Sequence, residues 1–394
     1  MERLLRTLID PARAGMVFPI AIVAFYGVWP LFREAQPTPG ARDAFALLPW
    51  ICAGWVAIGS LPFVTQTPEP LPDRRARVFV YGVFAAFAVF AAITLATAPS
   101  VPLLQALRGA SVEQIALSRE EFLKARTGAG AVLPYLNAML TSSLVPYALA
   151  IALLGRYRVA WFALAVFFAY SLVFMEKAFF LRLLLPMMAL VVVVDARMPK
   201  LWWMLAAAVG LLTANIAMSG FGSEGIGRFL LYRMLEVPPA TVIDSLDYWE
   251  LAHGSRWLDG ATSTLIASVL GLERVPFERD VFVYQFGDFE TGTASSNAAF
   301  FVEAYVNFGW TGVMAASVAL GVVVGHVGRS RDAALRCTLP LLLYTVFLGG
   351  LLGALFGGGL LILLAMAAWI NAGPSRNPAM PGDIPQVLPA IRSP

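Results

Sequence analysis

The chain has little charge, few cysteines and few histidines. Charged residues make up 13% of its 394 residues, about half the share of a soluble domain. Both cysteines, Cys52 and Cys337, lie in apolar stretches, which excludes a disulfide framework and a cysteine-based metal site. No cluster of Lys and Arg could form the basic face that nucleic acid requires. Walker loops, HExxH motifs and a Ser-His-Asp order are missing too, so we expect no metal and no cofactor.

Apolar residues dominate what remains. They make up 59% of the chain, and the mean hydropathy is +0.73, so we predict an all-α integral membrane protein. The first apolar run is interpreted as a membrane anchor, because no small-residue cleavage site follows it. Runs long enough to cross a bilayer predict about ten transmembrane helices, at 16–32, 44–64, 78–98, 134–154, 159–175, 180–195, 201–220, 298–325, 338–354 and 356–371.

These spans form one predicted membrane domain, 1–372, followed by a Pro-rich tail, 373–394, that we expect to be disordered and cytoplasmic. A large polar loop, 221–297, separates the seventh span from the eighth, and a smaller loop, 99–133, precedes the fourth. Within the large loop, 261–272 is moderately apolar and is expected to lie along the membrane surface as a short helix. Since loops on a rigid scaffold carry function, we expect the site beside the large loop.

Basic residues in the connectors predict the orientation, because cytoplasmic loops carry an excess of Lys and Arg. With ten spans, both termini and most basic groups fall on the cytoplasmic side: Arg3, Arg6, Arg13, Arg74, Arg75, Arg77, Arg156, Arg158, Arg197, Lys200, Arg329, Arg331 and Arg336. The two longer loops then face outward. Positive charge is disfavoured there, so the three basic sets that break the rule are expected to converge and bind an anion: Arg108, Arg119, Lys124 and Arg126; Lys177 and Arg182; Arg228 and Arg233.

The first of these sets could form an Arg pair for phosphate or have a purely structural role. Arg119 and Arg126 would share one face of a helix over 112–126, or Glu120 and Lys124 could pair on a solvated helix. Arginine supplies a planar fork of donors that suits phosphate oxygens.

The other sets leave similar alternatives open. Lys177 and Arg182 would suit a diphosphate at a membrane boundary, or Glu176 could neutralise them locally. Arg228 and Arg233 could likewise bind phosphate, or could extend to lipid headgroups.

The eighth predicted span opens with a polar stripe at spacings of three and four residues, which lie on one face of a helix: Ser296, Phe300, Glu303, Asn307 and Trp310. Glu303 would act as a general base or hold an arginine in place, and a structural ion pair is the alternative. Gly309 and Gly312 predict close contact between helices. His253 is a weaker candidate base, because a lone histidine in a loop is usually solvated.

Three stretches, 119–130, 231–240 and 297–312, together with the plan of spans and one late outer loop, resemble the Wzy-type O-antigen and exopolysaccharide repeat-unit polymerases. This group also includes the O-antigen ligases. The resemblance implies a GT-C-like glycosyltransferase in the bacterial inner membrane, with its active site facing the periplasm. It would extend undecaprenyl-diphosphate-linked oligosaccharides without metal or nucleotide sugar, together with a protein that regulates chain length. An O-antigen ligase that transfers glycan to the lipid A core, and a flippase of lipid-linked glycans, are the alternatives.

On this hypothesis, cations stabilise the leaving diphosphate and aromatic rings stack on sugars. The expected catalytic residues are Glu303, Arg233, Arg126 and His253, of which His253 matches the loop histidine of the ligases only loosely. The expected substrate-binding residues are Arg119, Lys177, Arg182, Arg228, Tyr232, Tyr248, Asn297, Tyr305 and Asn307.

Overall fold

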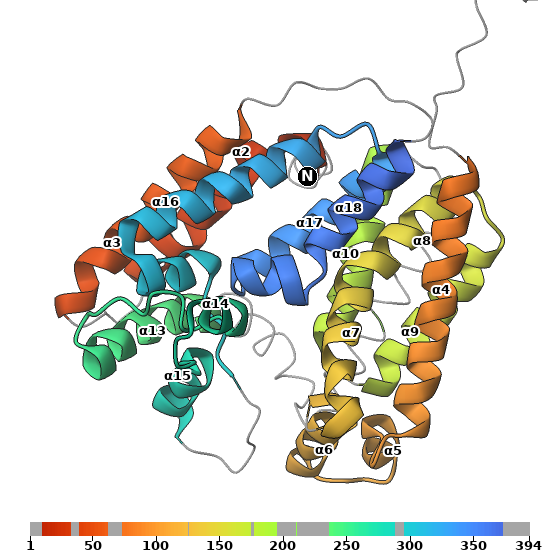
Figure 1. The fold of residues 1–394 in the computed structure, drawn as a ribbon, viewed down its shortest axis with the longest axis horizontal. Coiled ribbons are helices and arrows are strands. Elements are labelled where there is room, and N and C mark those ends of the chain that lie inside the picture. The colour runs from red at the N-terminus through yellow and green to blue at the C-terminus, as the bar shows by residue number, and fades with distance from the viewer. Residues whose placement is uncertain are drawn as a thin grey trace, which may run out of the picture.

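The computed structural model describes residues 10–32, 39–61, 73–124, 126–174, 177–194, 210, 236–287 and 295–372. Every regular element in these ranges is helical, and the ranges contain no strand (Figure 1). The predicted all-α class is therefore confirmed for the described part of the chain.

Within these ranges, five helical segments are long and apolar enough to cross a membrane. The first runs through η1 (Pro11–Arg13), α2 (Ala14–Ile22), η2 (Val23–Val28) and η3 (Trp29–Phe32), and the second and third are α3 (Pro39–Ser60) and α4 (Asp73–Ala96). The fourth joins η5 (Gly128–Val132), α7 (Leu133–Met139), η6 (Leu140–Leu144) and α8 (Val145–Leu154), and the fifth is α16 (Phe300–Gly328). These five segments support a membrane-embedded protein.

Four shorter apolar helices accompany them: α9 (Val159–Phe174), α10 (Lys177–Val194), α17 (Ala333–Phe347) and α18 (Leu360–Asn371). The five long and four short segments coincide with nine of the ten predicted spans. The seventh predicted span, 201–220, lies outside the described residues except for residue 210. The count of ten spans and a GT-C-like arrangement therefore stay predictions.

The predicted ninth span, 338–354, is wrong at its second end. Helix α17 ends at Phe347, and residues 348–350 separate it from a short helical stretch that continues into η8 (Gly353–Gly357). Two consecutive glycines, Gly349 and Gly350, weaken the helix at this point. Hydropathy alone does not detect such a break.

The long helices pack closely where glycine replaces a larger residue. Helices α3 and α16 lie against each other (Figure 1), and a side chain on Gly59 or Gly321 would overlap backbone of the opposite helix. Helix α17 packs on α8 and α10, and α4 packs on α8. The hydroxyl of Tyr26 donates to the Phe347 carbonyl (2.6 Å), which ties the first segment to α17. Small residues at such crossings allow the close approach typical of membrane helices.

Several basic groups that were predicted to be cytoplasmic share one end of the bundle, which we call the basic end. Arg329, directly after α16, donates to the carbonyl of Ser60 at the end of α3 (2.5 Å). Arg75, at the start of α4, donates to the carbonyl of Trp369 near the end of α18 (2.8 Å). Helix ends far apart in the sequence therefore meet at this level.

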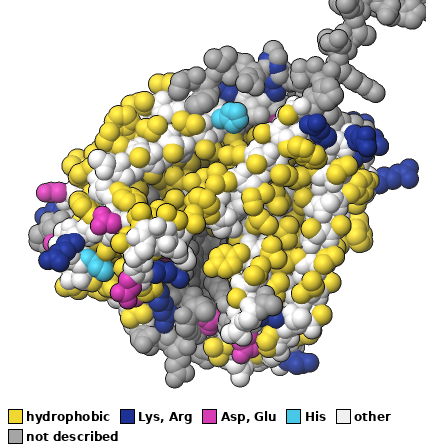
Figure 2. Space-filling model, in the orientation of Figure 1, with side chains coloured by type: hydrophobic (Ala, Val, Ile, Leu, Met, Phe, Trp, Pro, Cys, Tyr) yellow, Lys and Arg dark blue, Asp and Glu magenta, His cyan; other side chains and the backbone are white. Residues whose placement is uncertain are grey.

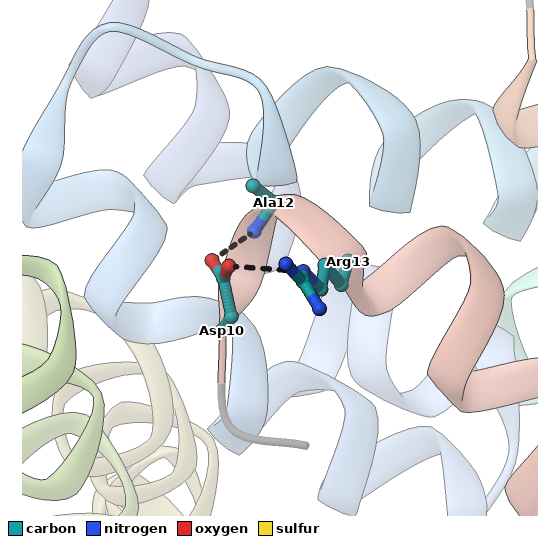
Figure 3. A network of polar contacts seen from close by, with 3 residues as sticks. All are labelled: Asp10, Ala12 and Arg13. Carbon is teal, nitrogen blue, oxygen red and sulfur yellow. Dashed lines mark hydrogen bonds and ion pairs between the residues drawn. The ribbon is translucent and has the colours of Figure 1, made fainter. Parts of the chain in front are cut away.

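The chain also enters the first segment at the basic end, and Figure 3 shows the contacts of Asp10 there. Asp10 accepts a hydrogen bond from the Ala12 N–H (3.0 Å) and pairs with Arg13 (3.6 Å), so it caps η1. Gly328, at the end of α16, leaves no room for a side chain beside the Pro11 carbonyl. This contact fixes η1 against the end of α16.

The opposite end carries the longer loops and is called the loop end. Helices α5 (Pro102–Leu107), α6 (Val112–Arg119) and η4 (Glu120–Lys124) lie there, as do α13 (Val237–His253), α14 (Thr264–Leu270) and α15 (Phe277–Phe286) (Figure 1). We call residues 236–287 the loop module. Figure 2 shows charged side chains toward two opposite ends of the molecule, with a hydrophobic belt between them. This distribution suits a protein that crosses a bilayer.

Candidate functional site

Glu303 lies in the first turn of α16, and its carboxylate lies against Gly350, just after α17. Its carboxylate accepts hydrogen bonds from the backbone N–H groups of Leu351 and Leu352. A side chain on Gly350 would overlap this carboxylate. An anion is stabilised at such a helix start, because free N–H groups point toward it. The Glu303 carboxylate therefore contacts the backbone at the break after α17.

Two N–H partners do not use the full hydrogen-bond capacity of the Glu303 carboxylate. Its two oxygens can accept about four hydrogen bonds, so capacity remains for a hydroxyl. Glu278 of α15 lies close enough to interact electrostatically with Glu303. Among the described residues, Glu303 is therefore held in place by backbone groups and lies within electrostatic range of a second carboxyl group. Its role as a base stays a prediction.

A chain of hydrogen bonds joins the loop module to the segment that enters α16. Gln285 donates to the carboxylate of Asp244 (2.6 Å), and the hydroxyl of Ser296 donates to Gln285 Oε1 (2.5 Å). The Ser296 N–H donates to the carbonyl of Glu278 (2.9 Å). Burial raises the pKa of Asp244, the Gln285 hydrogen bond lowers it in part, and Asp247 raises it further. The polar stripe predicted from the sequence does not include Gln285. Gln285 lies in α15 and Ser296 precedes α16, so no helical spacing relates the two residues.

Aromatic rings gather where the loop module meets α16. The indoles of Trp249 and Trp257 are stacked, with centroids 5.0 Å apart, and the ring of Tyr305 meets both edge-on. Trp310 packs on Tyr305 (5.0 Å). Tyr305 is buried, whereas Trp257 is 44% exposed. Trp257, which the sequence did not single out, is therefore the ring of this cluster best placed to meet a ligand.

Asn307 is fully occupied within the protein. Its side-chain amide donates to Thr262 Oγ1 and to the Glu303 carbonyl (both 2.7 Å), and its Oδ1 accepts from the Gly260 N–H (3.0 Å). The side chain is also buried. Its predicted contact with substrate is therefore replaced by a structural role, which is to attach the loop module to α16.

The remaining predicted residues of this region lie further apart. Tyr248 packs edge-on against His253 (centroids 5.9 Å), and the buried His253 Nε2 has no hydrogen-bond partner among the described residues. Asn297 is exposed, and within the described part of the chain its side chain accepts one long hydrogen bond, from the Ser295 hydroxyl (3.4 Å). Within the described ranges, none of the hydrogen bonds or ring contacts of these three residues involves the Glu303 carboxylate, so their roles stay predictions.

Arg126 has protein partners at all of its nitrogen atoms. Nε and Nη2 donate to the Phe122 carbonyl (3.0 and 2.9 Å), Nη1 donates to the Thr97 carbonyl and hydroxyl (2.6 and 2.9 Å), and Nη2 also donates to the Thr94 carbonyl (3.2 Å). These carbonyls include the free ones at the end of α4, which need donors. The guanidinium therefore caps α4, in place of the predicted phosphate contact.

The predicted shared face of Arg119 and Arg126 is wrong. Helix α6 ends at Arg119 and continues as a π-helical stretch, η4, to Lys124, and Arg126 lies beyond it. A π turn holds more residues than an α turn, so it changes the angle between positions seven apart. The seven-residue spacing assumed an unbroken helix.

Arg182 lies on α10 and joins a buried polar chain. Its Nη1 donates to Thr141 Oγ1 (2.8 Å), which donates to the Asn137 carbonyl (2.7 Å), and the Tyr170 hydroxyl donates to Asn137 Oδ1 (3.1 Å). An apolar cleft between α8 and α10 begins beside Arg182. A cation beside an apolar cleft suits an amphiphilic anion, and the anion-binding role of Arg182 stays a prediction.

Two further predicted cations, Arg228 and Arg233, lie outside the described residues, as do the side chains of Lys177 and Lys124. Tyr232, which was predicted to contact the substrate, also lies outside them. The predicted convergence of cations is therefore untested. Within the described ranges, no group of three or more His, Cys, Asp or Glu side chains could hold a metal ion.

Comparison of the chain with protein-family models, with characterised proteins and with solved structures found no match. The family resemblance therefore rests on the quoted stretches and on the arrangement of helices and loops.

Proposed function

We propose that the chain is a glycosyltransferase that polymerises undecaprenyl-diphosphate-linked oligosaccharide repeat units at the periplasmic face of the bacterial inner membrane. The observation that carries the proposal is the position of Glu303. Its carboxylate lies at the loop end, is held by the N–H groups of Leu351 and Leu352, and keeps capacity to accept a proton. Such a group suits a reaction in which a sugar hydroxyl must lose its proton.

The reaction would proceed by displacement at an anomeric carbon. The hydroxyl oxygen at the non-reducing end of a new lipid-linked unit attacks the anomeric carbon of the growing glycan. The bond from that carbon to the diphosphate oxygen breaks, undecaprenyl diphosphate leaves with the electron pair, and Glu303 takes the hydroxyl proton. Arg182 and the predicted residues Arg228, Arg233 and Lys177 would stabilise the charge on the leaving group.

Trp257 adds a surface on which a sugar ring could stack. It lies flat on Trp249 and is partly exposed, and aromatic faces bind the apolar faces of sugars through the same contacts that aromatic pairs make. Glu303 lies on the first turns of α16, as does Tyr305, whose ring packs edge-on against Trp257 of the loop module. Acceptor binding and proton removal would then take place beside the same end of one helix.

Purified protein in liposomes, supplied with lipid-linked repeat units alone, tests the proposal. A polymerase makes a ladder of longer glycans, whereas a ligase that lacks lipid A core and a flippase make none. Glu303→Gln keeps the shape of the side chain and an acceptor for the N–H groups, but its amide is not a base. We expect this variant to lose at least about 100-fold in polymer yield.

The matched control is Asp259→Asn, an equivalent change at an exposed residue of the loop module. Asp259 has a positive φ of 49°, which asparagine tolerates, so this variant should polymerise normally. A ladder from Glu303→Gln equal to that of the wild type would reject the base assignment. No ladder from the wild type would reject the polymerase.

A further inference from the structure

The loop module carries an apolar strip that faces away from the protein. Leu265 and Val269 are four residues apart, which places them on one side of α14, and Leu272 follows the glycine that ends this helix. They are 45%, 75% and 38% exposed, respectively. On the other side, Ala267 is buried. A soluble loop would not be expected to leave such a strip in water.

The turn that precedes the strip is attached to α16 by backbone hydrogen bonds. The N–H groups of Leu258 and Asp259 donate to the carbonyls of Val306 and Asn307 (both 3.0 Å). The side chain of Asn307 accepts from the Gly260 N–H (3.0 Å). The turn before α14 is therefore held at one height along α16.

That height is set by a break in α16. Gly309 has non-helical dihedral angles (φ 61°, ψ −152°). The part that follows, 310–328, is about 28 Å long at 1.5 Å per residue, which matches a hydrocarbon core of about 30 Å. Its far end lies at the basic end, beside Pro11. The break therefore falls where the hydrocarbon ends, and the turn before α14 is attached directly beside it.

Aromatic side chains mark the same level. Trp257 covers Gly309, where a side chain would press on the indole, and Trp310 follows the break. Phe308 is exposed and lies against the turn at Gly260. Trp residues concentrate at membrane surfaces, because one part of the ring is apolar and the N–H is polar. The apolar surface of the spans thus continues onto the loop module.

We propose that the strip Leu265, Val269 and Leu272 lies in the lipid bilayer, at the boundary between headgroups and acyl chains at the loop end. The bilayer is the occupant because the strip follows the turn at Gly260, against which Phe308 of a membrane-crossing helix lies, and this turn is held at the depth where that helix leaves the hydrocarbon. The contact anchors the loop module at a fixed height beside Glu303. The proposal does not depend on the chain being a polymerase.

A fluorophore that reports its surroundings tests the contact. In a background of Cys52→Ala and Cys337→Ala, Val269→Cys is labelled with NBD, and the protein is placed in phosphatidylcholine nanodiscs. Leu265→Cys serves as a second position on the strip. The control is Tyr284→Cys, at an exposed residue of α15, which Figure 1 places further from the spans. Lipids with a spin label near the headgroup or near the chain end act as quenchers.

We expect blue-shifted emission at 269 and 265, and quenching by the shallow spin label at least about threefold stronger than at 284. Water-like emission at 269 and 265, with quenching equal to that at 284, would overturn the proposal. Blue-shifted emission without lipid quenching would also overturn it, because a protein surface would then cover the strip. Stronger quenching by the deep spin label would contradict the proposed depth.

Discussion

The carboxylate of Glu303 lies directly against Gly350, 47 positions further along the chain, and accepts hydrogen bonds from the next two N–H groups. The carboxylate of one acidic residue near the start of α16 thus contacts the backbone between α17 and η8. The same contact joins helices that pack mainly with different neighbours, since α16 lies on α3 and α17 lies on α10. Glycine is required at position 350 because a side chain would overlap the Glu303 carboxylate. Its backbone conformation does not require glycine, since its φ is not in the left-handed region.

Gly350→Ala should destabilise the protein and impair activity. The added methyl group would overlap the Glu303 carboxylate, so the carboxylate or the break must move, at a cost of about 1–3 kcal/mol. We expect a lower melting temperature in detergent and shorter glycan chains per molecule of protein. Gly353→Ala is the matched control, since its methyl group meets no atom within 4 Å. Equal melting temperatures for the two variants would show that the contact is absent.

Arg126→Lys should lower stability without a specific effect on phosphate binding. Lysine keeps the charge but cannot reach the carbonyls of Thr94, Thr97 and Phe122 together. Unsatisfied carbonyls at the end of α4 should cost about 1–3 kcal/mol. Thermal unfolding measures this loss, and the apparent KM for lipid-linked units should stay unchanged. Arg108→Lys, at an exposed position nearby, should change neither. An increased KM with normal unfolding for Arg126→Lys would restore the phosphate assignment.

The hydropathy of the sequence predicted the positions of the helices well but not the places where they break. Hydropathy averages over about one span and does not detect single backbone angles. Gly309 and Gly312 were predicted to allow contact between helices. Gly309 instead breaks α16 beneath Trp257, and a side chain on Gly312 would overlap the carbonyl of Ala304 in the same helix.

The roles of charged side chains were predicted less well than the positions of helices, and for a different reason. A sequence shows that a residue such as Arg126 carries a cation, but it does not show which acceptor lies nearby. Here the acceptors Thr94 and Thr97 are about 30 positions earlier and become available only because α4 ends there. The rule that basic residues stay on the cytoplasmic side made cations at the loop end unusual. For Arg126, the structure shows that capping α4 accounts for its presence there.

Asn307→Ala should loosen the loop module locally. The change removes the acceptor for the Gly260 N–H and the donor to Thr262, while the two backbone hydrogen bonds to α16 remain. Limited digestion with trypsin measures the effect, because Arg256 is exposed beside the turn. Cleavage after Arg256 should be about tenfold faster, which corresponds to about 1.4 kcal/mol. Cleavage after the exposed Arg274 is the internal reference, and an unchanged ratio of the two would contradict the anchoring role.

Asp244→Asn should change how the stability of the protein depends on pH. Burial raises the pKa of Asp244 above its ordinary value of 3.8, with a partial reduction by Gln285 and a further increase by Asp247. The folded protein therefore binds this proton more tightly than the unfolded chain, so Asp244 contributes stability below the unfolded pKa and loses it as the pH rises through the folded pKa. Asparagine keeps an acceptor for Gln285 and has no charge. Melting temperatures measured from about pH 4 to about pH 8 should show Asp244→Asn more stable than the wild type at the neutral end, with the difference shrinking toward the acid end. The exposed Asp259→Asn should show no such trend, and a difference for Asp244→Asn that grows toward acid pH would mean that the carboxylate, not the acid, is the form that the fold prefers.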